Sequence, residues 1–132
     1  MGKISVRYLG GMSFEALARN HKFAVDVPLA LGGKDTGPTP VELFVTSLAA
    51  CTGMELAFYC KKFKWDPTGL KVEVNYEKSA DRIVKIFLEI SLPSAKTEKE
   101  RKEAMGWAEE CLVHNTMQHK PEIKIAFAVT GG

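Results

Sequence analysis

Apolar and polar residues alternate in six short segments of the chain, and this spacing is typical of half-buried β-strands. The first three segments are separated by Gly10-Gly11 and by Arg19-Asn20-His21, and they predict an antiparallel meander. The fourth and fifth predict a hairpin, and the sixth predicts a final strand with its apolar residues facing inward. The six segments are residues 4–9, 13–18, 22–27, 70–77, 83–92 and 122–129.

The longest apolar run, residues 39–64, has no such alternation and predicts a helix. Thr39 and Glu42 have the spacing of a capping box, and Pro40 suits the first helical position. Lysines close to the other end suit the negative end of the helix dipole. Because the run is apolar nearly all round, we expect a central buried helix.

A second helix is predicted from Thr97 to about Cys111 or His114. Thr97 and Glu100 repeat the capping-box spacing, and an apolar stripe follows at intervals of three and four residues. The predicted order is βββ-α-ββ-α-β. Strands grouped around two helices indicate an α+β fold with a largely antiparallel sheet packed on the central helix.

The totals describe an ordinary globular protein: 132 residues, 45% hydrophobic, 26% charged, with a net charge of +2. They predict one domain, residues 1–132, and argue against a nucleic-acid partner. The apolar run 43–59 contains Glu55 and is shorter than the roughly 20 residues of a membrane-spanning helix. Since residues 1–12 show no signal peptide, we expect a cytoplasmic protein without a membrane partner.

Three cysteines in a reducing compartment do not make a disulfide framework, and their spacing is not that of a zinc finger. Cys51 has room beside it, because its neighbours in the sequence are small. Cys60 is nine residues further along the helix, about 13 Å away on the opposite face, which is beyond disulfide reach. If Cys51 has a partner in the chain, it must be Cys111. The alternative is that each thiol is an inert part of the core.

Other side chains have possible chemical roles beside these thiols. His114 and Asn115 follow Cys111 closely, but this spacing does not fit a papain-like site, and a zinc site that also includes His119 has no further support. Arg19 is either a solvated turn residue or a guanidinium that stabilises a thiolate. A carboxylate at Glu55, one turn beyond Cys51, would raise the pKa of that thiol.

Two segments resemble the signatures of the OsmC/Ohr family, which comprises osmotically inducible and organic hydroperoxide resistance proteins. They are GPTPVELFVTSLAACTGMEL and AEECLVHNT, and the predicted strands agree in order and spacing. The resemblance implies an intertwined homodimer that reduces organic hydroperoxides with an external thiol, without metal or flavin. It implies that Cys51 is the peroxidatic cysteine and Cys111 the resolving cysteine. Arg19 falls in the loop where the family has its active-site arginine.

The sequence departs from the peroxidase members at two positions. Those members have glutamate directly after the proline that opens the helix, where it pairs with the arginine. Here Val41 takes that position, and Glu42 comes one residue later, which turns the side chain by about 100°. Leu112 stands where many members have proline. The alternative to a peroxidase is therefore a non-enzymatic, redox-sensing or small-molecule-binding dimer.

Overall fold

The computed structural model describes residues 2–129, and these residues divide into two compact units. The first unit contains residues up to 49 and residues 73–89, and the second contains residues 50–72 and those from 90 onward. Helix α1 and the β4–β5 hairpin contribute residues to both units. The elements are β1 (Ile4–Gly10), β2 (Ser13–Ala18), β3 (His21–Val25), a 3₁₀ turn η1 (Leu29–Leu31), α1 (Pro40–Phe63), β4 (Lys71–Lys78), β5 (Ile83–Ser91), α2 (Glu98–Ala108) and α3 (Leu112–Gln118).

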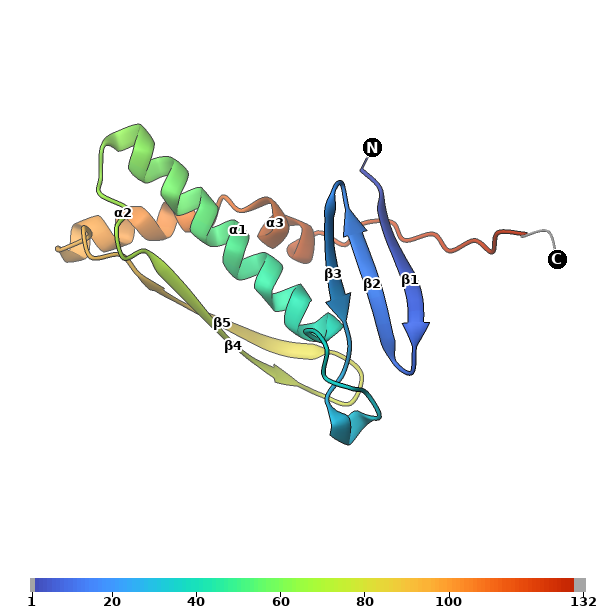
Figure 1. Ribbon diagram of the computed structural model, residues 1–132. Helices are drawn as coiled ribbons and strands as arrows, with labels where there is room; N and C mark the ends of the chain where they lie inside the picture. Colours follow the sequence, from blue (N-terminus) through green and yellow to red (C-terminus); the bar gives the residue numbers. More distant parts are fainter. Residues whose placement is uncertain (1, 130–132) are drawn as a thin grey trace. The chain divides into compact units, whose positions relative to one another are not determined.

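Strands β1, β2 and β3 form the predicted antiparallel meander (Figure 1). In its register Val6 pairs with Ala16, and Ala16 pairs with Phe23. The first turn needs glycine, because Gly10 and Gly11 have φ angles of 126° and 57°. Strands β4 and β5 form a separate two-stranded sheet. The first five predicted strands are therefore confirmed.

The loop before α1 is organised by the carboxylate of Asp26, which is buried although it is charged. Asp26 accepts hydrogen bonds from the Thr36 hydroxyl at 2.7 Å, from the Val27 backbone N–H at 2.7 Å, and from the backbone N–H groups of Lys34 and Thr36. Gly33 and Gly37 pass so close to neighbouring backbone that no side chain would fit. The hydrogen bonds to Asp26 hold the loop between β3 and α1 beside the end of β3.

Helix α1 begins as predicted, since Thr39 and Glu42 exchange both capping-box hydrogen bonds, at 2.8 and 3.1 Å. The prediction of a helix buried all round is wrong for the single chain. One stripe of α1 is buried, but large apolar residues lie exposed elsewhere on the helix. The buried residues are Val45, Leu48, Thr52, Leu56 and Cys60, and the exposed ones are Phe44, Met54, Phe58 and Phe63.

Helix α1 is longer than the apolar run 43–59, on which the prediction about membranes was based. The helix has 24 residues, and an 18-residue window reaches a mean hydropathy of 1.4, so by length and composition it is able to span a bilayer. The prediction that the run is too short is therefore wrong. A single such helix is weak evidence for a span, because core helices of globular proteins have the same length and composition.

The second unit has its own apolar core, in which α1, α2 and the segment after β5 meet. Trp107 is the largest member, and its ring lies 4.7 Å from that of Trp65 and 5.6 Å from that of Phe63, measured between centroids. The buried members are Leu56, Cys60, Leu92, Ala95, Ala104, Trp107 and Ala108.

The predicted second helix is two helices, and Cys111 lies in neither of them. Helix α2 begins at the predicted capping box and ends at Ala108. The backbone of Cys111 is extended, with φ −74° and ψ 128°, so the helical hydrogen-bond pattern is interrupted there. Cys111 is the N-cap of α3, and its sulfur accepts the backbone N–H of His114 at 3.4 Å.

The predicted final strand is absent from the described part of the chain. Residues 120–129 run on from α3 without regular structure (Figure 1). A strand needs a neighbouring edge for its backbone hydrogen bonds, and no strand of residues 2–129 pairs with this segment. Its alternating apolar side chains are 79% to 101% exposed, and they are Ile123, Ile125, Phe127 and Val129.

We expect Asp26→Asn to lower the melting temperature at neutral pH, because an amide cannot accept all the hydrogen bonds that the carboxylate accepts. The Thr36 hydroxyl and the Val27 backbone N–H lower the pKa of Asp26, against the effect of burial. The stabilisation is therefore fully present above about pH 3.9 and is lost as the pH falls through the lower pKa of the folded state. Melting curves of the two proteins should converge in acid. The exposed Asp35→Asn is the control, and a difference independent of pH would contradict the prediction.

Candidate active site

The structure brings Cys51 and Cys111 together within the second unit. Cys51 lies in α1 and is half-buried, whereas Cys111 is fully buried at the start of α3. Cys111 and the backbone N–H groups of Leu112 and Val113 lie close enough to Cys51 to lower the pKa of its thiol. An N-cap residue has an extended backbone, and the N–H groups that follow it have no partner within the helix. The interruption between α2 and α3 thus leaves the N–H groups of Leu112 and Val113 available to the Cys51 sulfur.

Opposing effects set the pKa of Cys51, and the lowering effects prevail. Burial is the largest single effect and raises the pKa of Cys51, because it removes water from the charged form. The hydrogen bonds from Cys111, Val113 and Leu112 together outweigh burial, although the negative charge of Glu55 opposes them. The pKa of Cys51 therefore lies below its ordinary value. Since the thiolate is the nucleophilic form, the lowered pKa favours Cys51 over Cys111 as the nucleophile.

The other two thiols are shifted in the opposite direction. Burial raises the pKa of Cys111, and so does the hydrogen bond that Cys111 donates to Cys51. Burial and the charge of Asp66 raise the pKa of Cys60. Cys51 therefore loses its proton at a lower pH than Cys111 does, and Cys60 is a buried thiol of the apolar core.

Arg19 and Glu42, the other two predicted site residues, belong to the first unit. Arg19 is an exposed residue of the turn between β2 and β3, with a φ of 54°. Glu42 is engaged in the capping box, where its carboxylate accepts the Thr39 backbone N–H. A role for either residue beside Cys51 stays a prediction.

Sequence reasoning predicted the effect of Glu55 on the pKa of Cys51 but missed the backbone groups that lower this pKa. The donors from Leu112 and Val113 are backbone amides, which have no sequence signature. At the end of α3, the backbone N–H of His119 donates to the Asn115 carbonyl oxygen at 3.0 Å. No group of three His, Cys, Asp or Glu side chains among residues 2–129 is arranged to hold a metal ion.

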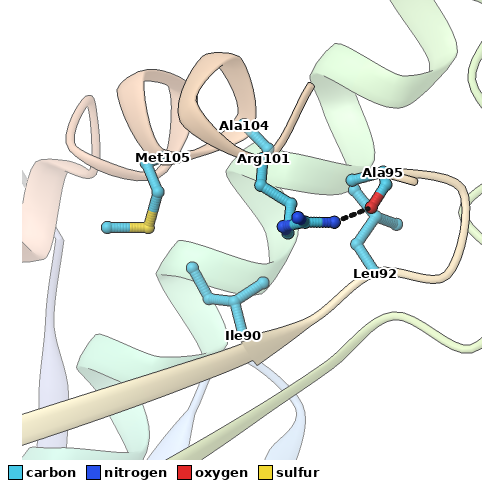
Figure 2. A pocket seen from close by; sticks show the side chains of 6 residues that line it. All are labelled: Ile90, Leu92, Ala95, Arg101, Ala104 and Met105. Carbon is cyan, nitrogen blue, oxygen red and sulfur yellow. Dashed lines mark hydrogen bonds between the residues drawn. The ribbon is translucent and has the colours of Figure 1, made fainter. Parts of the chain in front are cut away.

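A cavity of about 140 Å³ lies elsewhere in the second unit, between the end of β5, the following loop and α2 (Figure 2). Arg101 is its only charged residue, and one guanidinium nitrogen donates to the Ala95 carbonyl oxygen at 3.4 Å. Neither Cys51 nor Cys111 lines the cavity, so it is separate from the two thiols. The lining residues are Ile90, Leu92, Ala95, Arg101, Ala104 and Met105.

The family described as OsmC-like protein matches residues 33–126, which is most of the chain. The chain therefore belongs to the OsmC-like family. The matched region contains both cysteine-bearing segments, and it begins in the loop that Asp26 organises. The family resemblance stated from the sequence is confirmed.

Similar solved structures extend the comparison over nearly the whole chain. A protein from Psychrobacter arcticus, whose name refers to osmotic stress and detoxification, has a TM-score of 0.80 at 25% identity, covering 88% of each chain. An OsmC-like protein from Mycoplasma pneumoniae has a TM-score of 0.76 at 22% identity, covering 91% of this chain and 89% of its own. The organic hydroperoxide resistance protein OhrB of Bacillus subtilis has a TM-score of 0.60 at 23% identity, covering 91% of this chain and 92% of its own. These similarities confirm the α+β fold. No curated protein matches the sequence.

We expect Cys111→Ala to raise the pKa of Cys51, because the alanine removes one of the donors that stabilise the thiolate. Cys111→Ser keeps a donor at the same place and should raise the pKa less. Glu55→Gln should shift the pKa in the opposite direction, since it removes a negative charge. The measurement is ultraviolet thiolate absorbance against pH, in a Cys60→Ala background. A pKa of Cys51 that is the same in Cys111→Ala would contradict the assignment of the donors.

Proposed function

We propose that the protein is a thiol peroxidase that reduces organic hydroperoxides through Cys51 and Cys111. The observation that carries the proposal is the placement of the Cys111 thiol, at the start of α3, beside the Cys51 thiol of α1; this placement also lowers the pKa of Cys51. A nucleophilic thiolate next to a protonated second thiol is the arrangement that a two-cysteine peroxidase needs. Membership of a family with solved members named organic hydroperoxide resistance proteins supports the same reaction.

In the first step, the Cys51 thiolate attacks the terminal oxygen of the hydroperoxide. A sulfur–oxygen bond forms, the oxygen–oxygen bond breaks, and the alkoxide takes up a proton and leaves as an alcohol. Cys51 is oxidised by two electrons to a sulfenic acid, and the peroxide is reduced by the same two. Arg19 is the proposed source of positive charge at this step, with Glu42 as its carboxylate partner.

In the second step, the Cys111 sulfur attacks the sulfenic acid of Cys51. A disulfide forms, and water leaves with the oxygen of the sulfenic acid and the proton of Cys111. An external thiol or dithiol then reduces the disulfide through a mixed disulfide. The scheme uses no metal or flavin, and we place it in the cytoplasm, where such reductants are available.

The apolar character of α1 favours organic hydroperoxides over hydrogen peroxide. Met54 is exposed and lies three residues after Cys51, so the helical period places both on one side of α1. An apolar group carried by the substrate gains free energy by leaving water at such a surface, whereas hydrogen peroxide has no such group.

The second candidate is a non-enzymatic, redox-sensing or small-molecule-binding dimer. The hydrogen bond between Glu42 and the Thr39 backbone N–H favours it, because this carboxylate already has a structural role. Val41 stands at the position where the family's peroxidases have their glutamate. In a redox sensor, the same two thiols, Cys51 and Cys111, would be oxidised slowly to a disulfide and reduced slowly again.

We expect the wild type to consume cumene hydroperoxide in the presence of a dithiol, and Cys51→Ser to reduce consumption to the rate without protein. Cys111→Ser should accumulate a sulfenic acid that a dimedone-type probe traps, because resolution is blocked. Cys60→Ala is the matched control and should keep its activity. If wild type and Cys51→Ser consume peroxide equally slowly, the second candidate takes the place of the peroxidase.

We also propose that the protein acts as a homodimer, as the family resemblance implies. The exposed apolar residues of α1 and of segment 122–129 support this, because a soluble chain rarely leaves so many large apolar side chains in water. A second copy of the chain is the proposed cover for both surfaces. An alternating segment without a partner strand can complete its backbone hydrogen bonds on the edge of another sheet.

We expect the double substitution Ile125→Asp and Phe127→Asp to convert the dimer into a monomer. Charges on this apolar side of the segment would be buried when it pairs as a strand, and burying an unpaired charge is unfavourable. Analytical ultracentrifugation gives the mass in solution. Ala126→Asp with Ala128→Asp is the matched control, because these residues lie on the opposite side of a strand. A wild type that sediments as a monomer would refute the dimer.

A further inference from the structure

Tyr59 contacts the segment between α2 and α3 in two ways. Its hydroxyl donates a hydrogen bond to the Glu110 carboxylate, and its ring stacks on Trp107, with centroids 5.3 Å apart and an interplanar angle of 12°. Trp107 is buried in the core of the second unit, and Glu110 directly precedes Cys111. The contacts of Tyr59 therefore lie on both ends of the turn that leads to Cys111.

This turn is otherwise held by few bonds. The backbone N–H of Glu109 donates to Met105, and that of Glu110 donates to Trp107, at 3.2 and 3.1 Å. Both bonds are local, since they close the last turn of α2. They do not tie the turn to α1, where Cys51 lies. Contacts between α1 and the turn must therefore set the distance between the two sulfurs.

Tyr59 lies on the same helix as Cys51, eight residues further along, which is a rise of about 12 Å. An α-helix keeps this distance constant, because each residue is fixed by backbone hydrogen bonds. A contact at Tyr59 thus fixes where Glu110 and the next residue, Cys111, stand along α1. Hydrogen bonds to charged groups are stronger than those between neutral groups, and the Glu110 carboxylate is such an acceptor.

We propose that Tyr59 is a positioning residue that holds Cys111 against Cys51 through Glu110 and Trp107. The hydroxyl is the adjustable part of this contact, because Tyr59→Phe keeps the ring on Trp107 and removes only the hydrogen bond. The importance of Tyr59 for turnover rests on the proposed function, because only that reaction requires the Cys51–Cys111 disulfide to form in every cycle. The effect of Cys111 on the pKa of Cys51 does not depend on peroxidase activity.

The test measures two quantities in Tyr59→Phe. The first is the pKa of Cys51, which should rise, because Cys111 donates less well to the thiolate. The second is the rate at which the Cys51–Cys111 disulfide forms with diamide, a diazene that oxidises two thiols and is itself reduced to a hydrazine. We expect disulfide formation to be about tenfold slower, in line with the loss of one hydrogen bond to a charged group.

Further variants separate positioning from general destabilisation. Glu110→Ala removes the acceptor and should change both quantities in the same direction, so it tests the proposal even if Tyr59→Phe does not fold. Tyr8→Phe is the matched control, because it removes a tyrosine hydroxyl that donates to Gly11 elsewhere in the chain. It should leave both quantities as in the wild type.

The outcomes distinguish this proposal from the proposed function. If either the pKa of Cys51 or the rate of disulfide formation is unchanged in Tyr59→Phe and in Glu110→Ala, Tyr59 is not a positioning residue. Diamide needs no peroxidase activity. A wild type that closes its disulfide with diamide but does not consume hydroperoxide would refute the peroxidase and leave the role of Tyr59 supported by the two measurements.

Discussion

A sulfur that is partly removed from water can carry a negative charge only if hydrogen-bond donors face it, and this requirement governs the second unit. The donors to Cys51 come from one place, the break between α2 and α3. A continuous helix through Cys111 would have used the N–H groups of Leu112 and Val113 in its own hydrogen bonds. The interruption leaves them free for the thiolate, so the reactivity of Cys51 depends on a helix that ends early.

The same break explains why the two thiols differ, although both are removed from water. Cys111 is more deeply buried, which raises the pKa of its thiol, whereas its proximity lowers the pKa of Cys51. In the peroxidase reaction that we propose, the Cys51 thiolate would attack first and the Cys111 thiol would keep its proton until the second step. Two cysteines with equal surroundings would compete for the same role in that scheme.

The sequence predicted most of the fold, and its failures have physical causes. The meander, the hairpin and the start of α1 follow from alternation, glycine turns and a capping box, which are all local signals. The break at Cys111 was missed because residues 97–114 contain no proline or glycine at the point where the helix ends. The final strand was predicted from alternation alone. Alternation indicates that a segment has one apolar and one polar face, but it does not show that a neighbouring strand is present to pair with it. For the site, the pair Cys51 and Cys111 was predicted, whereas backbone donors and the contacts of Tyr59 depend on tertiary structure.

The exposed segment 122–129 has a consequence for the newly made chain. Residues 125–129, IAFAV, have high β-propensity and contain no charge and no proline, which is the composition of segments that stack into cross-β fibrils. Lys120, Glu122 and Lys124 carry charge only on the side nearer α3, so they protect one half of the segment. The exposure of residues 125–129 therefore carries a risk of aggregation, which rises with the concentration of the chain.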